Sequence, residues 1–263
     1  MNDHRDREAR NGESWNGEPW ETALPGPLAG NTVWTVDIAA AAPWQRDCAA
    51  VLSAAETERA ARFRRPEDRD RFVVSHAALR LVLGRALDAA PEALAFTEGP
   101  AGKPDLAEPW RGRLHFNLSH SGGRALVGLS PSAAIGVDVE ALRPMPDAER
   151  VARSYFAPDE AAALAALPDE AREGAFMAVW TCKEAVVKAL GTGLSMPLDR
   201  FSVSLPPAPA LILSARGARL DPAALTLMRL EPGPGTLGAA AIAEPGANLL
   251  LRTLATGWPD RIA

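Results

Sequence analysis

Lysine is scarce in this chain of 263 residues, because only three of its 28 basic residues are lysine. They are Lys103, Lys183 and Lys188, and each lies in a short segment close to glycine, proline or tryptophan. A lysine ammonium is a compact charge whose pKa can shift, whereas an arginine guanidinium is a planar, permanently protonated fork. A codon preference for arginine explains the general scarcity. Either the same preference left these three lysines by chance, or lysine remains where arginine would fail, which makes these segments candidate chemical sites.

Cysteine is also rare. Cys48 and Cys182 are too few and too widely spaced for a disulfide framework or a zinc cluster, which suits a reducing compartment. We expect both to be buried thiols. No apolar run approaches the roughly 20 residues of a membrane span, and the N-terminus lacks the regions of a signal peptide. We therefore expect a cytoplasmic protein that does not bind a membrane.

The formal net charge is −5, which argues against a general affinity for nucleic acid or anionic membranes, so any anion site must be local. Hydrophobic residues make up 47% of the chain, enough for one large domain or two small lobes. Residues 1–31 are rich in Asn, Gly, Glu, Arg and Pro without periodicity. This segment is therefore predicted to be a flexible leader.

Hydrophobic periodicity predicts a first lobe over residues 32–131 and a second lobe over residues 132–263. In the first lobe we expect a long helix at 68–87, strands at 33–38 and 94–97, a loop at 99–104, and a hairpin of 114–119 with 125–129. In the second we expect helices at 147–155, 158–167 and 169–190, and strands at 135–140, 201–205, 210–214, 225–230 and 237–242. Gly191 is expected to end the last helix. The fold class is thus α+β, with two similar lobes.

Two carboxylates share one face of the strand at 135–140. Strand alternation sends Asp138 and Glu140 to one side and the apolar residues to the other. Their Cα atoms are roughly 6.5 Å apart by strand rise, so both can reach one cation, and Gly136 leaves space on that face. Carboxylate ligands suit Mg²⁺ or Mn²⁺. The alternative is an ordinary solvated face of an amphipathic strand.

The helix at 169–190 adds a third carboxylate. Trp180, Glu184 and Lys188 follow at i, i+4 and i+8 and therefore share a face. Lys183 lies about 100° around the helix from Glu184, and we expect it to line a ligand cleft or to face solvent. The alternative for Glu184 and Lys188 is an exposed pair that contributes a few tenths of a kcal/mol. The helix runs into 191–194, a Gly-Thr-Gly-Leu turn that lets backbone approach a ligand.

Several polar and basic side chains are candidates for holding phosphate. Residues 117–121, Asn-Leu-Ser-His-Ser, end a strand in a polar corner, although a lone histidine such as His120 is more often a surface or core residue. Arginines gather before and at the start of the long first-lobe helix: Arg59, Arg62, Arg64, Arg65, Arg69 and Arg71. They are either a solvated helix surface or, with Lys103, a site for several phosphate charges.

Four segments in this order closely resemble the 4′-phosphopantetheinyl transferases of the long, two-lobed type, which activate peptide and polyketide synthases. They are 102–104 (Gly-Lys-Pro), 117–121, 136–140 (Gly-Val-Asp-Val-Glu) and 180–194. The resemblance covers about residues 33–242. It implies a monomer whose lobes are related by a pseudo-twofold, each a small, mainly antiparallel sheet packed on a long helix. It also implies coenzyme A and Mg²⁺ in the cleft between the lobes.

The resemblance implies roles by position. The metal ligands would be Asp138, Glu140 and Glu184, and the catalytic candidates are Glu184, Lys188 and His120. Glu184 would take the proton of a carrier-protein serine, directly or through water, and Lys188 would contact the pyrophosphate. The residues that resemble coenzyme A contacts are Arg59, Gly102, Lys103, Pro104, Asn117, Ser119, His120, Asp138, Glu184 and Lys188. Position 56 departs from the pattern, because it is Glu where some relatives carry a second cation.

The function that follows is the Mg²⁺-dependent transfer of 4′-phosphopantetheine from coenzyme A to a serine of an acyl or peptidyl carrier protein, releasing 3′,5′-ADP. One alternative is a Mg²⁺-dependent nucleotide phosphohydrolase, and another is a non-catalytic binder of coenzyme A or of a carrier protein. The complete set of Asp138, Glu140, Glu184 and Lys188 argues against the binder. The lack of a further acidic cluster for a second metal argues against the hydrolase. The pathway, whether for a siderophore, a peptide or a polyketide, is left open.

Overall fold

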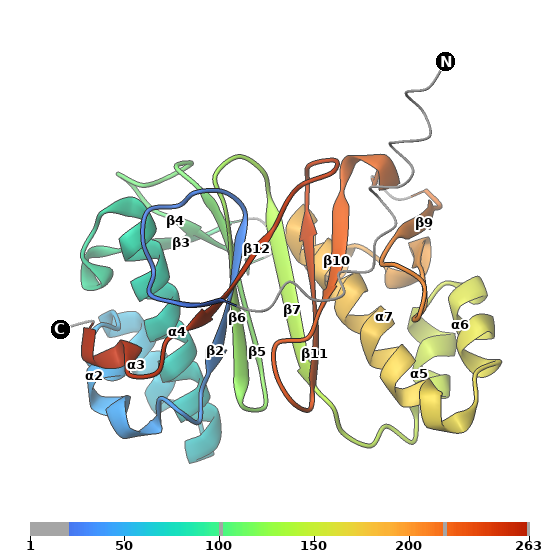
Figure 1. Ribbon diagram of the computed structural model, residues 1–263, viewed down its shortest axis with the longest axis horizontal. Helices are drawn as coiled ribbons and strands as arrows, with labels where there is room; N and C mark the ends of the chain where they lie inside the picture. Colours follow the sequence, from blue (N-terminus) through green and yellow to red (C-terminus); the bar gives the residue numbers. More distant parts are fainter. Residues whose placement is uncertain (1–20, 100–101, 218–219, 262–263) are drawn as a thin grey trace.

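The computed structural model describes residues 21–99, 102–217 and 220–261, and structural statements below concern these residues. Four layers lie side by side in Figure 1: the first-lobe helices, a five-stranded sheet, a three-stranded sheet and the second-lobe helices. Within the described ranges, no helix is both long and apolar enough to span a membrane. Most of the predicted leader, residues 1–20, lies outside the described residues.

The first lobe contains every element that periodicity predicts for it, with bounds shifted by only one or two residues. Its helices are α2 (Gln45–Ala50), α3 (Ala54–Ala61) and α4 (Pro66–Leu87), with short 3₁₀ turns at Ala42–Trp44 and Pro91–Ala93. Its strands are β2 (Thr32–Asp37), β3 (Phe96–Glu98), β4 (Pro104–Leu106), β5 (His115–Ser121) and β6 (Arg124–Ser130). Helix α4 buries Phe72, Leu79 and Leu83 against Val36 and Val127 of the sheet.

The second lobe also follows the prediction. Its helices are α5 (Ala148–Tyr155), α6 (Pro158–Ala165) and α7 (Asp169–Leu190), and its strands are β7 (Ile135–Ala141), β8 (Phe201–Val203), β9 (Ile212–Ala215), β10 (Thr226–Leu230) and β11 (Thr236–Ile242). Three 3₁₀ turns lie at Gly193–Ser195, Leu198–Arg200 and Pro222–Ala224. Gly191, at φ 65°, ends α7 in the left-handed conformation that glycine adopts without strain.

The two lobes are built alike. Helices α4 and α7 each have 22 residues, and each lies on the outer face of its own sheet in Figure 1. Strands β2, β6 and β5 pair antiparallel in one sheet, and β10, β11 and β7 in the other. A shared apolar cluster contains Val33 and Leu126 from the first sheet and Ile135, Val137 and Ile242 from the second. The predicted α+β fold of two similar lobes is confirmed.

The lobe boundaries differ from the predicted ones. Strand β12 (Leu250–Leu254) pairs parallel with β2, so the C-terminal segment belongs to the first sheet. Leu254 and Trp258, the latter in a final 3₁₀ turn at Trp258–Arg261, lie in the first-lobe core. Residues 21–23 form strand β1 (Glu21–Ala23), which extends this sheet beyond β12, although they fall within the predicted leader. Pairing between strands more than 200 residues apart leaves no mark in local periodicity.

Gly136 has a different role from the one expected. A Cβ at this position would lie 2.1 Å from the carbonyl oxygen of Ala185 and 2.3 Å from the backbone nitrogen of Ala189. The space beside Gly136 is therefore filled by the backbone of α7 and does not face a ligand. Strand β7 and helix α7 touch backbone to backbone, which places Asp138 next to the last turns of α7.

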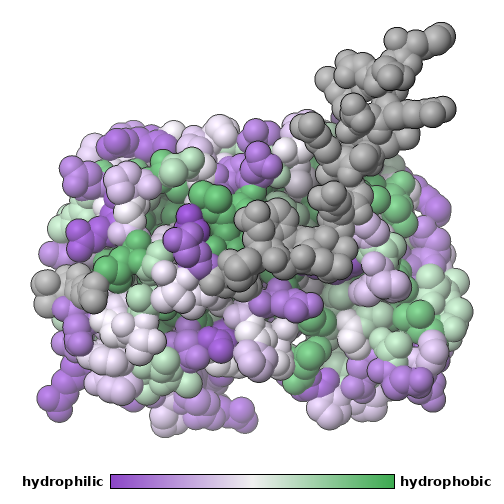
Figure 2. All heavy atoms as spheres, in the orientation of Figure 1, coloured by the Kyte–Doolittle hydropathy of each residue, from purple (hydrophilic) through white to green (hydrophobic). Residues whose placement is uncertain are grey.

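Polar residues cover most of the face shown in Figure 2, and apolar residues gather in its upper middle, between the lobes.

Cys48 and Cys182 are buried free thiols, as predicted. Burial raises the pKa of Cys48 to about 12 and that of Cys182 to about 11. Neither sulfur is therefore a thiolate at neutral pH.

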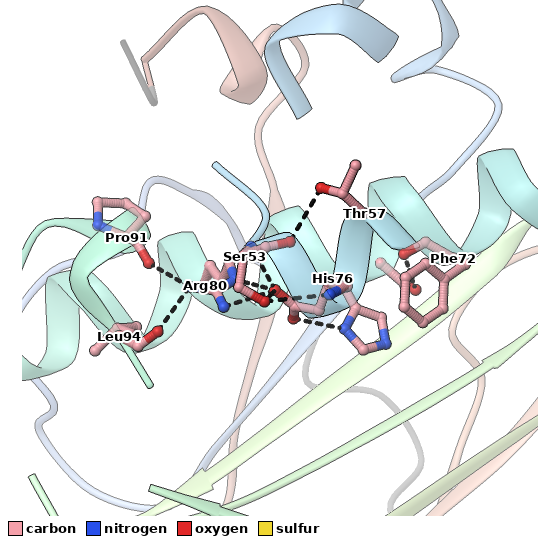
Figure 3. A network of polar contacts seen from close by, with 9 residues as sticks. Ser53, Thr57, Phe72, His76, Arg80, Pro91 and Leu94 are labelled. Carbon is pink, nitrogen blue, oxygen red and sulfur yellow. Dashed lines mark hydrogen bonds and ion pairs between the residues drawn. The ribbon is translucent and has the colours of Figure 1, made fainter. Parts of the chain in front are cut away.

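Glu56 joins α3 to α4 through contacts with His76 and Arg80, which Figure 3 shows close to Ser53. Its carboxylate accepts from the backbone N–H of Ser53 at 2.9 Å, which completes a capping box at the start of α3. The same carboxylate lies 3.0 Å from Nδ1 of His76 and 2.6 Å from a guanidinium nitrogen of Arg80. Arg80 is 1% exposed and donates onward to the carbonyl oxygens of Pro91 and Leu94.

Replacing Gly136 with alanine tests the contact between β7 and α7. We expect Gly136→Ala to lower the free energy of unfolding by about 3 kcal/mol, the upper end of overpacking costs, because backbone atoms block the new methyl group. Gly174→Ala is the matched control, since an added Cβ there meets no atom within 4 Å and a helical glycine becomes alanine. Gly174→Ala should raise the free energy of unfolding by roughly 0.5–1 kcal/mol. Urea unfolding measures both, and a cost below about 1 kcal/mol at position 136 would contradict the contact.

Acid should weaken the Glu56 network. Burial raises the pKa of Glu56, but hydrogen bonds from His76 and Arg80 outweigh it and hold the pKa at about 2, below the usual 4.5. The stabilisation is thus complete above pH 4.5 and is lost as pH falls towards 2. It amounts to about 3 kcal/mol on the linkage relation. Denaturant unfolding across this range should show a shallower pH dependence for Glu56→Gln, whereas exposed Glu58→Gln should follow the unmodified chain. Parallel curves for all three proteins would refute this role.

Candidate active site

Two adjoining pockets lie between the lobes. The larger has a volume of about 710 Å³ and is lined by α7, the end of α5 and residues 191–199. The smaller has a volume of about 440 Å³ and is lined by α3, α4 and β5. Both are lined by Gly102, Pro104, Asn117 and Lys188. They therefore form one cleft with walls from both lobes.

The cleft gathers the residues that the sequence suggests for coenzyme A. Nine of them line one or both pockets: Arg59, Gly102, Lys103, Pro104, Asn117, Ser119, His120, Glu184 and Lys188. Asp138, the tenth, lies behind the cleft wall and contacts Ser119 and Lys188. Residues from distant parts of the sequence thus meet at one place in the fold.

Asp138 is almost fully buried, with 4% of its surface exposed. Its Oδ1 accepts from the Lys188 ammonium at 2.6 Å and from the Ser119 hydroxyl at 3.0 Å. Its Oδ2 is buried without a hydrogen-bond partner among the residues that the structure describes. Burial raises the pKa of Asp138 to about 6, although the Lys188 charge opposes this. An unpaired buried carboxylate oxygen is costly, so Oδ2 is a candidate cation ligand.

The other two acidic residues are partly exposed. Oε2 of Glu140 accepts from the Ser121 hydroxyl at 2.7 Å. Glu184 lines the larger pocket, and within the described ranges no hydrogen bond or ion pair holds its carboxylate. In the described part of the chain, no group of three or more His, Cys, Asp or Glu side chains is arranged to hold a metal. Asp138, Glu140 and Glu184 as joint ligands therefore stay a prediction.

Strands β5 and β7 are joined by side chains. Oδ1 of Asn117 accepts from the backbone N–H of Val137 at 2.8 Å. The Ser119 and Ser121 hydroxyls accept in the same way from β7, at 3.4 and 3.2 Å, each two residues further along. These two hydroxyls also contact the Asp138 and Glu140 carboxylates. The junction between the lobes thus also orients two acidic side chains of the site.

His120 faces the smaller pocket as a neutral side chain. Burial lowers its pKa to about 4, and the charges of His76 and Arg71 add to this effect. Its Nδ1 is buried with no hydrogen-bond partner in the described part of the chain. At neutral pH the imidazole is therefore available as a hydrogen-bonding group and not as a cation.

Arg59 is the basic residue of α3 that lines the smaller pocket, and its guanidinium lies 5.3 Å from the centre of the Phe72 ring. Glu56, three positions earlier, directs its carboxylate to His76 and Arg80. It therefore neutralises positive charge at the pocket wall. Three other arginines form ion pairs with nearby acids at the surface: Arg62, Arg69 and Arg71. These three match the solvated-surface interpretation.

Lys183 neither lines the cleft nor faces solvent, contrary to expectation. Its side chain is fully buried, and its Nζ lies 2.7 Å from a carboxylate oxygen of Glu160. The same ammonium donates to the carbonyl oxygens of Leu198 and Phe201, at 2.8 and 2.5 Å. Burial lowers its pKa, and Glu160 opposes this. Helical geometry gives the angle between Lys183 and Glu184 around the helix. It does not show which element packs over Lys183.

Some cleft residues carry no signal in the sequence. Met196 and Leu198 form an apolar part of the larger pocket, and His76 lines the smaller one. Their roles depend on how α4 and the segment after α7 pack. Ser121 could have been found, because three polar side chains alternate along β5 with apolar or aromatic ones.

Two family models match the chain in succession. Residues 40–132 match "4′-phosphopantetheinyl transferase, N-terminal", and residues 134–232 match the "4′-phosphopantetheinyl transferase superfamily". The second match follows the first directly, with only residue 133 between them.

Relatives of the same name align with much of the chain. The 4′-phosphopantetheinyl transferase HetI of Nostoc sp. is 37% identical over 81% of this chain and 88% of that protein. A Synechocystis relative is 43% identical over 57% of this chain, and this chain spans 61% of its length. Sfp of Bacillus subtilis is 32% identical over 59% of this chain and 66% of that protein.

Among solved structures, the holo-[acyl-carrier-protein] synthase of Thermotoga maritima matches 43% of this chain and 64% of its own, with 18% identity and a TM-score of 0.34. The family assignment does not depend on this match. It follows from the two family models and from HetI, which aligns over most of its length. The chain belongs to the 4′-phosphopantetheinyl transferase superfamily, in its long, two-lobed type.

Proposed function

We propose that this protein transfers the 4′-phosphopantetheine group of coenzyme A to a serine of an acyl or peptidyl carrier protein and releases 3′,5′-ADP. Membership of the family supports the general reaction, and HetI and Sfp both have the name of this enzyme. The observation that carries the proposal is the pair of Glu184 and Lys188. They share one face of α7, and both line the cleft between the lobes.

In the proposed reaction, the serine oxygen bonds to the β-phosphorus of coenzyme A. The bond from this phosphorus to the bridging oxygen breaks, and 3′,5′-ADP leaves with the bonding electrons. The free carboxylate of Glu184 takes the serine proton, directly or through water. Lys188 stabilises the negative charge that develops on the leaving phosphate. Arg59 and neutral His120 bind the nucleotide end in the smaller pocket.

The acidic residues fit a magnesium ion, with manganese as an alternative. Asp138 has a buried oxygen that meets no partner among the described residues, and Glu140 lies two residues further on the same face of β7. Hard oxygen donors are the ligands that these ions prefer. We propose Asp138, Glu140 and Glu184 as the ligands. A cation bound there would neutralise charge on the pyrophosphate.

The partners in this proposal are coenzyme A and a carrier protein, without nucleic acid or membrane. We propose that the protein acts as a monomer in the cytoplasm, since the two similar lobes already provide both walls of the cleft. Peptide, polyketide and siderophore pathways all use such carriers, so the test must include several.

The deciding experiment incubates the protein with coenzyme A, Mg²⁺ and several apo carrier proteins and weighs the carriers. We expect each accepted carrier to gain one phosphopantetheine, and a carrier with its serine replaced by alanine to gain none. Addition of EDTA should stop the reaction, and added Mg²⁺ should restore it. Release of 3′,5′-ADP without a carrier would instead identify a hydrolase. Coenzyme A binding with no change in any carrier would identify a binder.

Glu184→Gln tests the proposed base. We expect turnover to fall by roughly 10²–10⁴-fold, because the amide cannot take the serine proton, while coenzyme A still binds. Transfer kinetics and calorimetry measure the two effects separately. Glu170→Gln, in the exposed first turn of the same helix, is the control and should behave as the unmodified protein. Unchanged turnover for Glu184→Gln would remove this residue from the mechanism.

A further inference from the structure

Lys103 links the two lobes through its ammonium group. Its Nζ donates to the carbonyl oxygen of Ile135 at 3.1 Å and to that of Lys188 at 2.7 Å. Lys103 comes from the first lobe, just before β4, whereas the two acceptors belong to β7 and to the last turn of α7. One side chain therefore connects the first lobe to a strand and a helix of the second.

The end of α7 is a favourable place for this charge. The carbonyl oxygen of Lys188 lies in the last helical turn, where such groups lack a full helical partner, and Gly191 reaches it only at 3.3 Å. The negative end of the helix dipole also favours a cation there. The Lys103 side chain runs along Gly191, because a Cβ on that glycine would lie 3.9 Å from Cδ of Lys103.

The acceptors of Lys103 are neutral carbonyl groups. Within the described ranges it forms no salt bridge, and burial lowers its pKa to about 8, although the charge of Asp105 opposes this. A compact ammonium fits between two such oxygens, whereas a planar guanidinium needs more room and a different geometry. These two hydrogen bonds also occupy donors of the ammonium that would otherwise be free for a phosphate oxygen.

Lys188 is consequently held at two points. Its carbonyl oxygen is bound by Lys103, and its ammonium is bound by Asp138 and Ser119. Glu184 lies one turn earlier on the same face of α7. Any movement of this helix end relative to the first lobe would move both side chains relative to the pocket wall formed by β5.

We propose that Lys103 is a positioning residue, which fixes the end of α7 against the first lobe and so aligns Glu184 and Lys188 with the bound coenzyme. This inference rests on the proposed function, and it replaces the direct coenzyme contact that the sequence suggests. The two roles differ in their consequences. A coenzyme ligand governs affinity and tolerates arginine, whereas a positioning residue governs turnover and does not.

The test compares Lys103→Met and Lys103→Arg with the unmodified protein. We expect kcat to fall by about 10- to 100-fold in both, because a small misalignment of reacting groups is costly. The Kd for coenzyme A, measured by calorimetry, should change by less than about threefold. Hydrogen exchange of the amides in residues 185–193 should become faster, while exchange in α4 stays the same. Arg111→Met, at an exposed position of the same lobe, is the control.

The opposite pattern overturns the inference. This pattern is a Kd for coenzyme A that is weakened by about tenfold or more, while kcat and hydrogen exchange are unchanged. Full activity of Lys103→Arg would also overturn it. If Lys103→Met does not fold, Lys103→Gln, which is shorter and uncharged, is measured in the same assays against the same criteria. Failure of the proposed function is separate from this. If the unmodified protein transfers nothing, coenzyme A binding and hydrogen exchange still decide whether Lys103 holds the end of α7.

Discussion

The backbone contact between β7 and α7 at Gly136 determines the geometry of the site. A side chain there would overlap Ala185 and Ala189, so the strand and helix approach as closely as they do only because this residue lacks a Cβ. The approach has a chemical consequence two residues further along β7. Asp138, on the same face, comes within 2.6 Å of the Lys188 ammonium. The distance between strand and helix therefore sets which charged groups can meet.

The junction between the lobes uses the same atoms as the candidate site. Most strands in a sheet pair through their backbones, but β5 and β7 are linked by Asn117, Ser119 and Ser121, whose side chains accept from backbone N–H groups. A hydroxyl that accepts from backbone can still donate, and the two serines donate to Asp138 and Glu140. Stability of the joint and orientation of the carboxylates are thus coupled, and a substitution in β5 would affect both.

Local patterns predicted the long helices, the hairpin and most strands, because each depends on a period within one short segment. The sequence could not predict β12 beside β2, since that pairing is set by how the chain returns after β11. The same limit explains Lys183 and Gly136. The strand and helix periods predict the faces on which Gly136 and Lys183 lie. Only the packing shows that Glu160 lies beside Lys183 and that the backbone of α7 lies beside Gly136. Helical periodicity placed Glu184 and Lys188 on one face, and only the resemblance of motifs assigned them to one site with the cleft residues of the first lobe.

The three lysines share one physical property in the structure. Each ammonium lies between closely spaced oxygens: two carbonyls for Lys103, two carbonyls and a carboxylate for Lys183, and a hydroxyl and a carboxylate for Lys188. A small group with three donors and no fixed plane suits such sites, whereas arginine suits flat, forked acceptors and open surfaces. All three sites connect other elements to α7, and the Lys188 site also lies at its cleft face. Lysine thus remains where one helix must be held closely on several sides.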